Sequence, residues 1–464
     1  MVYYITTLLV YGGVDAIACL GLSQQFGVGG VTNFGFIIFQ AAGAYAAGVL
    51  SLPDAGANGG FQTYVGGLSL PFPLPWIGAA LVGGLLAVPF AAIVGRRLRG
   101  DFAAVGLLVT AVMFNLLATN YTPLVNGAAG LSLVPAPLQG SLNPQSAGYQ
   151  WLYGAAAVAL ALVTYLFVNR LTESPYGRTL RAMRDNDVVA DSLGKNLRSL
   201  RTSSLVVGGA IAGLSGGILV GFINLWDPQA WGYAETVVLF AAVIIGGLGN
   251  HRGAVLGALV VPLAFEEATR YIPPVPSDPN LIPALQWVII GLLIITFLWF
   301  RPQGILPERR RRIASRAGEL GAAPSGNAGA TNGSALTTAL PIPGPAAHNR
   351  GTHPAGDSDR DGKGREVILQ CRGLSRSFDG VEVVGDVSID FQRGRLTGII
   401  GPNGAGKSTV LAMLAGTLPA SAGQILLQGD DVTSMPAYRR ARAGPGRAFP
   451  LASEFKRLTV IENL

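Results

Sequence analysis

A glycine-rich run with a single lysine, GPNGAGKST at 401–409, has the residue types and spacing that can hold a chain of phosphates. The glycines let successive backbone N–H groups turn inward toward phosphate oxygens, and the lysine can reach the outer phosphates. The serine places a hydroxyl where a Mg²⁺ ion would bind, at a helix N-terminus whose dipole favours anions. The sequence therefore predicts a nucleotide-binding loop formed by nine residues, with Ser408 on the metal: Gly401, Pro402, Asn403, Gly404, Ala405, Gly406, Lys407, Ser408 and Thr409.

Two elements must position such a loop, a strand before it and a helix after it. The segment LTGII at 396–400 is apolar and rich in branched residues, which predicts a strand. The segment STVLAMLAGTL at 408–418 has helical spacing and good helix formers, which predicts a helix. The order strand, glycine-rich loop, helix is the one that a phosphate-binding loop requires, and it disfavours the alternative of a chance glycine-rich turn.

Most of the remaining chain has the composition of a membrane protein. Half of the 464 residues are hydrophobic and only 13% are charged, whereas soluble domains carry about 25% charged residues. The mean hydropathy is +0.43. No lysine or arginine precedes Arg96, whereas arginines crowd residues 301–316. The net charge of +7 therefore indicates the cytoplasmic side of a membrane and not a nucleic-acid partner.

Nine apolar stretches are candidate spans, because a helix needs about 20 apolar residues to cross the hydrocarbon core. They are residues 3–22, 26–50, 76–95, 102–119, 151–169, 204–223, 235–249, 253–269 and 283–301. With nine spans the arginines at 96–99, at 178–201, at 252 and from 301 onward share one side, and only Arg270 lies opposite. The positive-inside rule then places the N-terminus outside and the phosphate-binding loop in the cytoplasm.

The second predicted span is unusually polar. Residues 21–50 are threaded with glycines and carry four side-chain amides: Gln24, Gln25, Asn33 and Gln40. Small residues allow close helix approach, which is one explanation of the pattern. A broken helix that lines a solute pathway is the other, since irregular backbone at membrane depth is tolerated only around a cavity or inside protein. The four amides are therefore candidate pathway residues.

A cytoplasmic loop at 172–203 is too polar to enter the membrane and too regular for a linker. Its apolar residues form an interrupted amphipathic pattern: Leu180, Met183, Val188, Val189 and Leu193. The Asp185-Asn186-Asp187 sequence interrupts that pattern. We expect two short helices joined at this turn, with three arginines exposed on one side: Arg178, Arg181 and Arg184. A solvated basic connector is the alternative.

The sequence SPYGRTLRAMRDNDVVADSLG at 174–194 resembles the coupling loop of ATP-binding-cassette (ABC) importer permeases. The whole stretch 21–306 resembles the permeases of branched-chain amino acid importers, through RRLRG, NGAAGLS, IIGGLGNHRGAVLGALV and WFRPQGILP. The resemblance implies that the loop docks on an ATPase subunit and passes its movement to the spans. It assigns this role to eight residues: Gly177, Arg178, Arg181, Arg184, Asp185, Ala190, Leu193 and Gly194.

The chain changes character after the last span. Residues 308–365 are first basic and then rich in Gly, Ala, Pro and Ser, which predicts a flexible tether. From 366 the sequence resembles the ATPase subunit of the same importers. Alternating apolar positions at 367–371 and 387–391 indicate antiparallel strands, and 416–432 resembles the strand pair that follows the phosphate-loop helix. Phe378 stands where the family has an aromatic that stacks on adenine, although a core or turn aromatic is the alternative.

Two departures from the ATPase pattern stand out. Phe449-Pro450 replaces a phenylalanine-glutamine pair whose glutamine, by resemblance, contacts Mg²⁺. The sequence ends at Leu464, so the Walker B acids, catalytic glutamate, signature and switch histidine would lie downstream. Hydrolysis needs such groups, so we predict no catalytic residue in these 464 residues and no ATP hydrolysis by the chain alone.

The sequence thus predicts a multi-span α-helical membrane domain at 1–307, a linker at 308–365 and a partial α/β P-loop ABC nucleotide-binding domain at 366–464. The resemblance implies a multi-pass protein of the cell membrane, an ATP-driven importer of branched-chain or related amino acids with ATP and Mg²⁺ as cofactors. Its expected partners are a second permease, complete ATP-binding subunits, an external solute-binding protein and membrane lipid. Import of urea or another small solute is one alternative, and a transport-inactive, membrane-anchored nucleotide-binding remnant is another.

Overall fold

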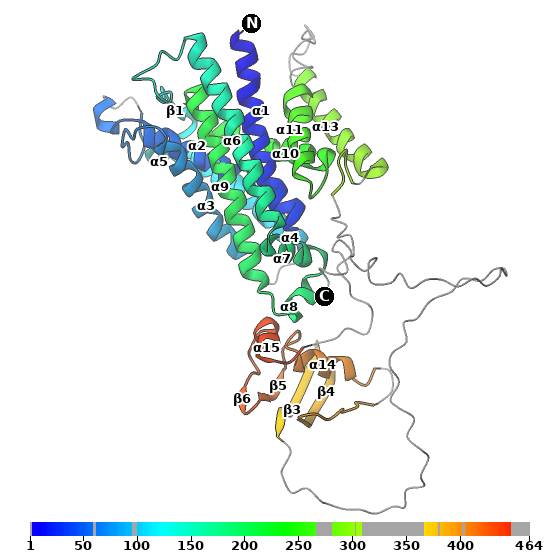
Figure 1. Cartoon of the computed structure of the whole chain (residues 1–464). Helices are drawn as coiled ribbons and strands as arrows, with labels where there is room; N and C mark the ends of the chain where they lie inside the picture. The colour runs from blue at the N-terminus through cyan, green and yellow to red at the C-terminus, as the bar shows by residue number, and fades with distance from the viewer. Residues whose placement is uncertain are drawn as a thin grey trace, which may run out of the picture. The chain divides into compact units, whose positions relative to one another are not determined.

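The computed structural model describes residues 2–58, 62–94, 100–265, 281–301, 303–308, 366–378, 381–400 and 404–446 (Figure 1). The chain divides into two compact units. One comprises Met1–Arg311, Ala415–Leu418 and Met435–Leu464, and the other comprises Arg312–Leu414 and Pro419–Ser434. The predicted tether, the arginines at 96–99 and Arg270 lie outside the described residues, apart from Glu308 at the start of the tether.

Long apolar helices make up the first unit. They are α1 (Val2–Leu22) with its π-helical continuation η1 (Ser23–Val28), α2 (Ile37–Ser51), α3 (Leu74–Val94), α4 (Gly100–Asn120), α6 (Ala147–Glu173), α9 (Leu197–Ile223), α10 (Tyr233–Gly246), α11 (His251–Ala258) with η5 (Leu259–Phe265), and α13 (Leu281–Phe300). Short elements connect them: η2 (Ala55–Asn58), α5 (Thr122–Val125), η3 (Gly127–Ala129), β1 (Leu131–Ser132), α7 (Pro175–Asp185), α8 (Asp187–Ser192), β2 (Leu225–Trp226) and η4 (Pro228–Trp231).

Each predicted span corresponds to one of these apolar helices. Within the described residues, five helices are long and apolar enough to cross a membrane, and four more are apolar but shorter. The multi-span helical fold is therefore confirmed, while the count of nine spans stays a prediction.

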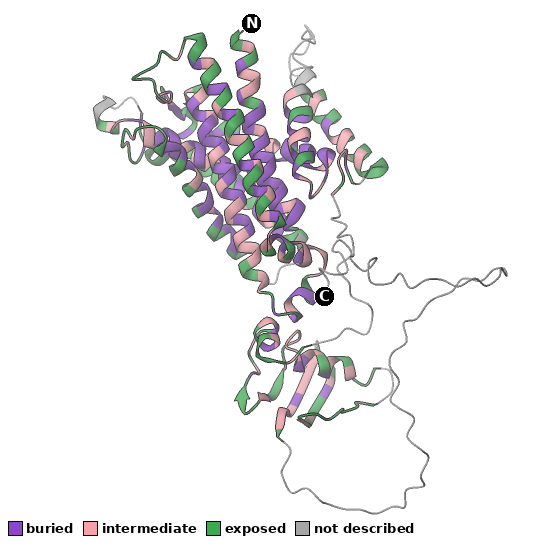
Figure 2. Ribbon diagram, in the orientation of Figure 1, coloured by how far each residue is buried: buried purple, intermediate pink, exposed green. Residues whose placement is uncertain are grey.

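Burial separates inner helices from outer ones (Figure 2). In the apolar 18-residue window of each helix, 61% of the residues are buried in α9 and 67% in α1 with η1, against 22% in α4 and 28% in α6. Glycine explains how closely the inner helices approach. A Cβ added at Gly43 of α2 would lie 2.3 Å from Gly213 Cα of α9. Such backbone contacts are typical of membrane helices, because lipid gives no hydrophobic drive for association and packing must supply it.

The second predicted span is broken, which agrees with the second of the two explanations of its sequence. Residues 23–28 continue the first helix as η1, so Gln24 and Gln25 belong to its end, and α2 begins only at Ile37. With 15 residues, α2 is about 22 Å long, which is shorter than the hydrocarbon core of about 30 Å. Its first amide is satisfied from another helix, since Ile37 N donates to Thr236 Oγ1 of α10 at 3.1 Å.

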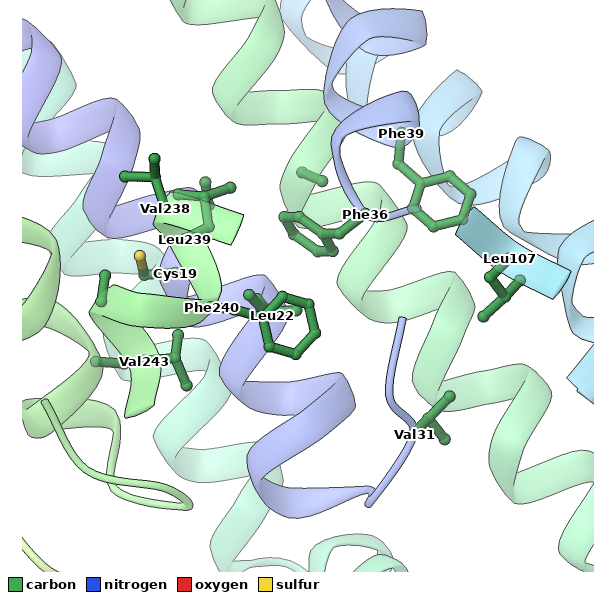
Figure 3. Close-up of a cluster of buried hydrophobic side chains, with 14 of the residues drawn as sticks. Cys19, Leu22, Val31, Phe36, Phe39, Leu107, Val238, Leu239, Phe240 and Val243 are labelled. Atoms are coloured by element: carbon green, nitrogen blue, oxygen red, sulfur yellow. The ribbon is translucent and has the colours of Figure 1, made fainter. Parts of the chain in front are cut away.

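A hydrophobic core surrounds this break (Figure 3). It joins side chains of α1, α4 and α10 with those of the turn at 29–36 and the start of α2. The side chains labelled in Figure 3 are Cys19, Leu22, Val31, Phe36, Phe39, Leu107, Val238, Leu239, Phe240 and Val243, and all are buried. The break is therefore held inside protein, the only environment in which irregular backbone is stable at membrane depth apart from an aqueous cavity.

The second unit contains a four-stranded antiparallel sheet with the order β4-β3-β5-β6. Its strands are β3 (Val367–Phe378), β4 (Val381–Gln392), β5 (Ala422–Leu427) and β6 (Asp430–Asp431), and α14 (Lys407–Leu414) contacts β3 and β4. The short helix α15 (Ala437–Ala443) follows along the chain and belongs to the first unit. These elements confirm both predicted strand pairs and the helix after the glycine-rich loop.

The strand predicted at 396–400 is wrong. The described residues 395–400 contain no strand, and the side chains of Leu396 and Ile400 are 98% and 97% exposed. A strand forms by pairing with another strand. Within the described residues, the four strands of this sheet pair only with one another, so the apolar segment has no partner strand.

Candidate functional site

The described part of the glycine-rich loop, from Gly404 onward, turns into the start of a helix. Gly404 and Gly406 have φ values of +89° and +79°, a left-handed conformation that glycine adopts at no steric cost. Among the described residues, and apart from its chain neighbours, no atom lies within 4 Å of a Cβ built on Gly404. Lys407 begins α14, and Val410 N donates to Gly406 O at 2.9 Å. Gly401, Pro402 and Asn403 lie outside the described residues, so nucleotide binding by the whole loop stays a prediction.

Phe378, the predicted adenine-stacking residue, ends β3 and its side chain is 41% exposed. The Arg376 guanidinium carbon lies 4.7 Å from the centre of its ring, and Arg376 Nη1 donates to Pro419 O at 3.0 Å. One face of the ring is therefore covered by a cation, an arrangement that stabilises an aromatic ring. Because Phe378 is this exposed, it is not a core residue. Its stacking on adenine stays a prediction.

Replacing Phe378 with alanine should weaken ATP binding by about fivefold to tenfold, which is the effect of losing one aromatic stacking contact. Replacing Phe378 with tyrosine should leave the affinity within about twofold, since tyrosine keeps the ring. Titration of the full chain with a fluorescent ATP analogue measures both. Equal affinity of the alanine variant and the unmodified chain would contradict the stacking role.

The cytoplasmic loop forms two helices, as the sequence predicts. Helix α7 begins with Pro175 at its first position, which suits proline because the missing N–H has no partner there. Asn186 then separates the helices and caps α8, since its side chain accepts from Val189 N at 3.1 Å. Gly177, Leu180 and Met183 form the buried face of α7, and the latter two pack against Val28 of η1.

The loop arginines differ from the prediction. Arg178 is exposed as expected, but Arg181 and Arg184 are not on an open surface. Their side chains are only 19% and 11% exposed, and both pair with Glu308, at 3.4 Å from Arg181 Nε and 3.0 Å from Arg184 Nη2. The prediction missed this because Glu308 is more than a hundred residues away in the sequence.

The second half of the loop keeps an exposed apolar surface. Ala190 is buried, whereas the side chains of Val188 and Leu193 are 51% and 57% exposed. Gly194 ends the segment in a left-handed turn with φ +80°. Partial burial, with a further contribution from the nearby Asp187 charge, raises the pKa of Asp191. In α7, burial raises the pKa of Tyr176, against a hydrogen bond with Ser203 that lowers it.

The four amides of the broken span fall into two groups. Gln25 and Asn33 are fully paired, because Gln25 Nε2 donates to Leu205 O at 3.0 Å and Asn33 Nδ2 donates to Gln25 Oε1 at 2.9 Å. In the part of the chain that the structure describes, Gln24 Nε2 and Gln40 Oε1 have no hydrogen-bond partner although both side chains are buried. The contacts of Gln25 and Asn33 are those of residues that stabilise the fold. Gln24 and Gln40 each keep one polar atom to which a passing solute or water could bind.

Replacing Asn33 with alanine should destabilise the chain by about 2–4 kcal/mol, because two buried groups lose their partners. These groups are Gln25 Oε1 and Gly35 N, which donates to Asn33 Oδ1 at 3.1 Å. Thermal unfolding in detergent measures the loss. Replacing Asn120, whose side chain is exposed and bonds only to Leu116 O, is the matched control and should have little effect.

The sequence did not predict a buried polar cluster around His251. His251 is buried at the start of α11, where its Nε2 lies 2.8 Å from Thr172 Oγ1 and its Nδ1 lies 3.5 Å from Ser23 Oγ. Thr172 Oγ1 in turn lies within hydrogen-bond distance, 3.2 Å, of Gln24 Oε1. The cluster joins η1 to the ends of two other helices. Only the short polar sequence Asn250-His251-Arg252 between two apolar runs could have drawn attention to it.

Comparison with known proteins decides the family. Residues 4–298 match the family described as the branched-chain amino acid transport system permease component. The chain belongs to this family. A probable branched-chain amino acid transport permease protein LivM of Methanocaldococcus jannaschii is 27% identical over 334 residues, which covers 66% of this chain and 94% of that protein. LivM of the Escherichia coli high-affinity system is 26% identical over 320 residues, which covers 64% of this chain and 69% of LivM.

The C-terminal part of this permease-family chain matches a second family. Residues 384–463 match the ABC transporter family. A probable ABC transporter ATP-binding protein of Azorhizobium caulinodans is 51% identical over 99 residues, which covers 21% of this chain and 35% of that protein. The chain therefore joins a permease to part of an ATP-binding domain. It is a multi-pass membrane protein of the ABC transporter class, and its ATP-binding part faces the cytoplasm.

Proposed function

We propose that this chain is one permease half of an ATP-driven importer of branched-chain amino acids, fused to part of an ATP-binding domain. The observation that carries the proposal is the combination, in one chain, of a permease-family match over residues 4–298, a two-helix loop where the coupling loop is predicted, and a glycine-rich loop with two left-handed glycines before a helix. ATP bound at Lys407, with Mg²⁺ on Ser408, would drive closure of paired ATP-binding domains. That closure would push on residues 172–203 and switch the side to which the spans open.

The permease part, and not the ATP-binding part, supports import. An ATP-binding protein of the Escherichia coli lipopolysaccharide export system is 42% identical to this chain over 98 residues, so the ATP-binding sequence alone does not favour either direction. The permease relatives are named as permease proteins of branched-chain amino acid transport, and the import direction is taken from the resemblance to importer permeases. A second permease, complete ATP-binding subunits and an external solute-binding protein would complete the assembly. The domain limits at 307 and 365 belong to the same proposal.

Uptake by cells tests the proposal. Deleting the coding region in the native host should lower the uptake of radiolabelled leucine, isoleucine and valine, and expressing the full chain should restore it. Labelled urea is the matched control and should enter at the same rate in every strain. A loss of urea uptake with unchanged leucine uptake would replace the proposed solute by the small-amide alternative.

A remnant without transport activity is the second candidate. The Phe449-Pro450 sequence favours it, because proline lacks the side-chain oxygen of the expected glutamine. The ordered coupling loop favours transport instead. If the chain with Lys407→Ala restores uptake as well as the unmodified chain does, the ATP-binding part of this chain has no role in transport. Restoration only by the unmodified chain excludes the remnant.

A further inference from the structure

Segments far apart in the sequence converge on η1 at the cytoplasmic end of the first helix. Gln25 bonds to Leu205 in the first half of α9, and Val28 packs against α7. A Cβ built on Gly27 would lie 2.7 Å from Gly249 N, which shows how closely the turn between α10 and α11 approaches. The non-helical turn at 29–36 follows η1 and leads into α2. The segment is thus placed between the coupling loop and the broken span.

Arg184 of α7 makes the most specific of these contacts. Its Nη1 donates to Gly27 O, and its Nη2 donates to both carboxylate oxygens of Glu308, at 3.0 and 3.3 Å. Only 11% of the side chain is exposed. A guanidinium offers five donors in a rigid plane, so it can hold a main-chain carbonyl and a carboxylate at once, which the single ammonium of lysine does with less geometric definition.

The surrounding backbone is shaped to admit this arginine. Gly30 has φ +66°, and a Cβ there would lie 2.7 Å from Arg184 Cγ. Gly249 has φ +74°, and a Cβ there would lie 2.9 Å from Glu308 Cδ and 3.1 Å from Arg184 Nη1. A side chain at either position would displace the arginine or the carboxylate. The two glycines therefore leave room for the ion pair.

Glu308 is itself anchored to the membrane part. Ile305 N and Leu306 N donate to the carbonyl oxygens of Ile245 and Gly246 in α10, at 2.8 and 2.9 Å. Asn250 Nδ2 donates to Pro307 O at 3.0 Å. The carboxylate is therefore fixed relative to α10 and α11. Arg184 can pair with it only while α7 remains against η1.

We propose that Arg184 is a positioning residue of transport, which fastens the coupling helix α7 to η1 so that movement of the loop reaches the broken span. The inference rests on the proposed function for its role in transport, but the link between α7 and η1 can be tested without it. Apolar packing of Leu180 and Met183 on Val28 holds the same two elements together, and the ion pair fixes their register.

Hydrogen exchange of the full chain in lipid nanodiscs tests the link. Within η1 and its end, the amides of Gly29, Gly30 and Val31 bond to carbonyls of residues 24–26. Arg184→Ala and Glu308→Ala should each speed exchange of these amides by about tenfold or more, and the double variant should be no faster than the single ones. Arg178→Ala, an exposed arginine of the same helix, is the matched control and should leave exchange unchanged. Unchanged exchange in Arg184→Ala, or equal acceleration along the whole chain, would overturn the link.

The number of solute molecules moved per ATP hydrolysed tests the transport role, in the assembly purified from the native host and reconstituted into liposomes. Arg184→Ala should lower this ratio by about tenfold while ATP hydrolysis stays within about twofold, and Arg184→Lys should recover part of the ratio because its charge still pairs with Glu308. A parallel fall of transport and hydrolysis would show a merely structural role and overturn the inference. Absence of amino-acid transport by the unmodified assembly would overturn the proposed function instead, and the exchange result would stand. If Arg184→Ala does not fold, Arg184→Lys and Glu308→Gln replace it in both measurements.

Discussion

Replacing Lys407 with alanine is expected to weaken ATP binding by about 100-fold, close to 2.7 kcal/mol, which amounts to loss of binding at ordinary nucleotide concentrations. Lys407 lies at the start of α14, directly after Gly406 and three residues after Gly404, and both glycines have the left-handed conformation. Its ammonium is the cation of the described loop that can reach the outer phosphates of a bound nucleotide. Fluorescence titration of the full chain with an ATP analogue, in the presence of Mg²⁺, measures the change.

Arg393→Ala is the matched control. Arg393 lies in the same unit, and its side chain makes a 3.3 Å ion pair with Glu366 in which both side chains are at least 60% exposed. An exposed pair contributes little, so this variant should bind ATP with the affinity of the unmodified chain. If Lys407→Ala and Arg393→Ala bind equally well, the glycine-rich loop is not the nucleotide site.

Removing Mg²⁺ separates the two parts of the predicted site. Ser408 is expected to hold the metal, so Mg²⁺ should not strengthen ATP binding by Ser408→Ala. The affinity of this variant with Mg²⁺ should equal that of the unmodified chain with a chelator. The matching measurement is the same titration with and without EDTA. An undiminished response of Ser408→Ala to Mg²⁺ would contradict its role as a metal ligand.

Local sequence patterns predicted much of the architecture. Apolar stretches of about 20 residues located the helices, and alternation located β3 and β4, because these signals depend on neighbours within a few residues. The turn at Asn186 was also predicted, since its side chain caps the very next helix. The helix that follows the glycine-rich loop also belongs to this group, while phosphate binding by the loop stays a prediction.

Contacts between distant segments were not predictable in the same way. Amphipathic analysis of 172–203 placed all three arginines on an open side, whereas Glu308 draws two of them inward. The pattern of 21–50 indicated a break but not its position, because the π-helical end of α1 is stabilised by α7, α9 and the turn at 247–250. The segment 396–400 has a strand composition, yet a strand needs a neighbour that local composition does not supply.

Replacing Gly43 with leucine is expected to have the largest effect on the membrane part. Its Cβ would lie 2.3 Å from Gly213 Cα and 2.4 Å from Gly213 O, so α2 and α9, two closely packed inner helices, would have to separate. Overpacking costs about 1–3 kcal/mol where side chains can yield, and here the obstacle is backbone, so we expect more than that range. The midpoint of thermal unfolding in detergent, followed by size-exclusion chromatography, should fall below that of every other variant proposed.

Gly148→Leu is the matched control for this change. Gly148 lies in α6, where no atom is within 4 Å of an added Cβ, so the same side chain should be accommodated with little loss of stability. The short helix α2 is held by its contact with α9 and by the core around Phe36 and Phe39. We therefore expect the break in the second span to depend in part on the contact with α9. Equal unfolding midpoints for Gly43→Leu and Gly148→Leu would mean that α2 can leave α9 at no cost. The close approach would then contribute nothing to holding the broken span.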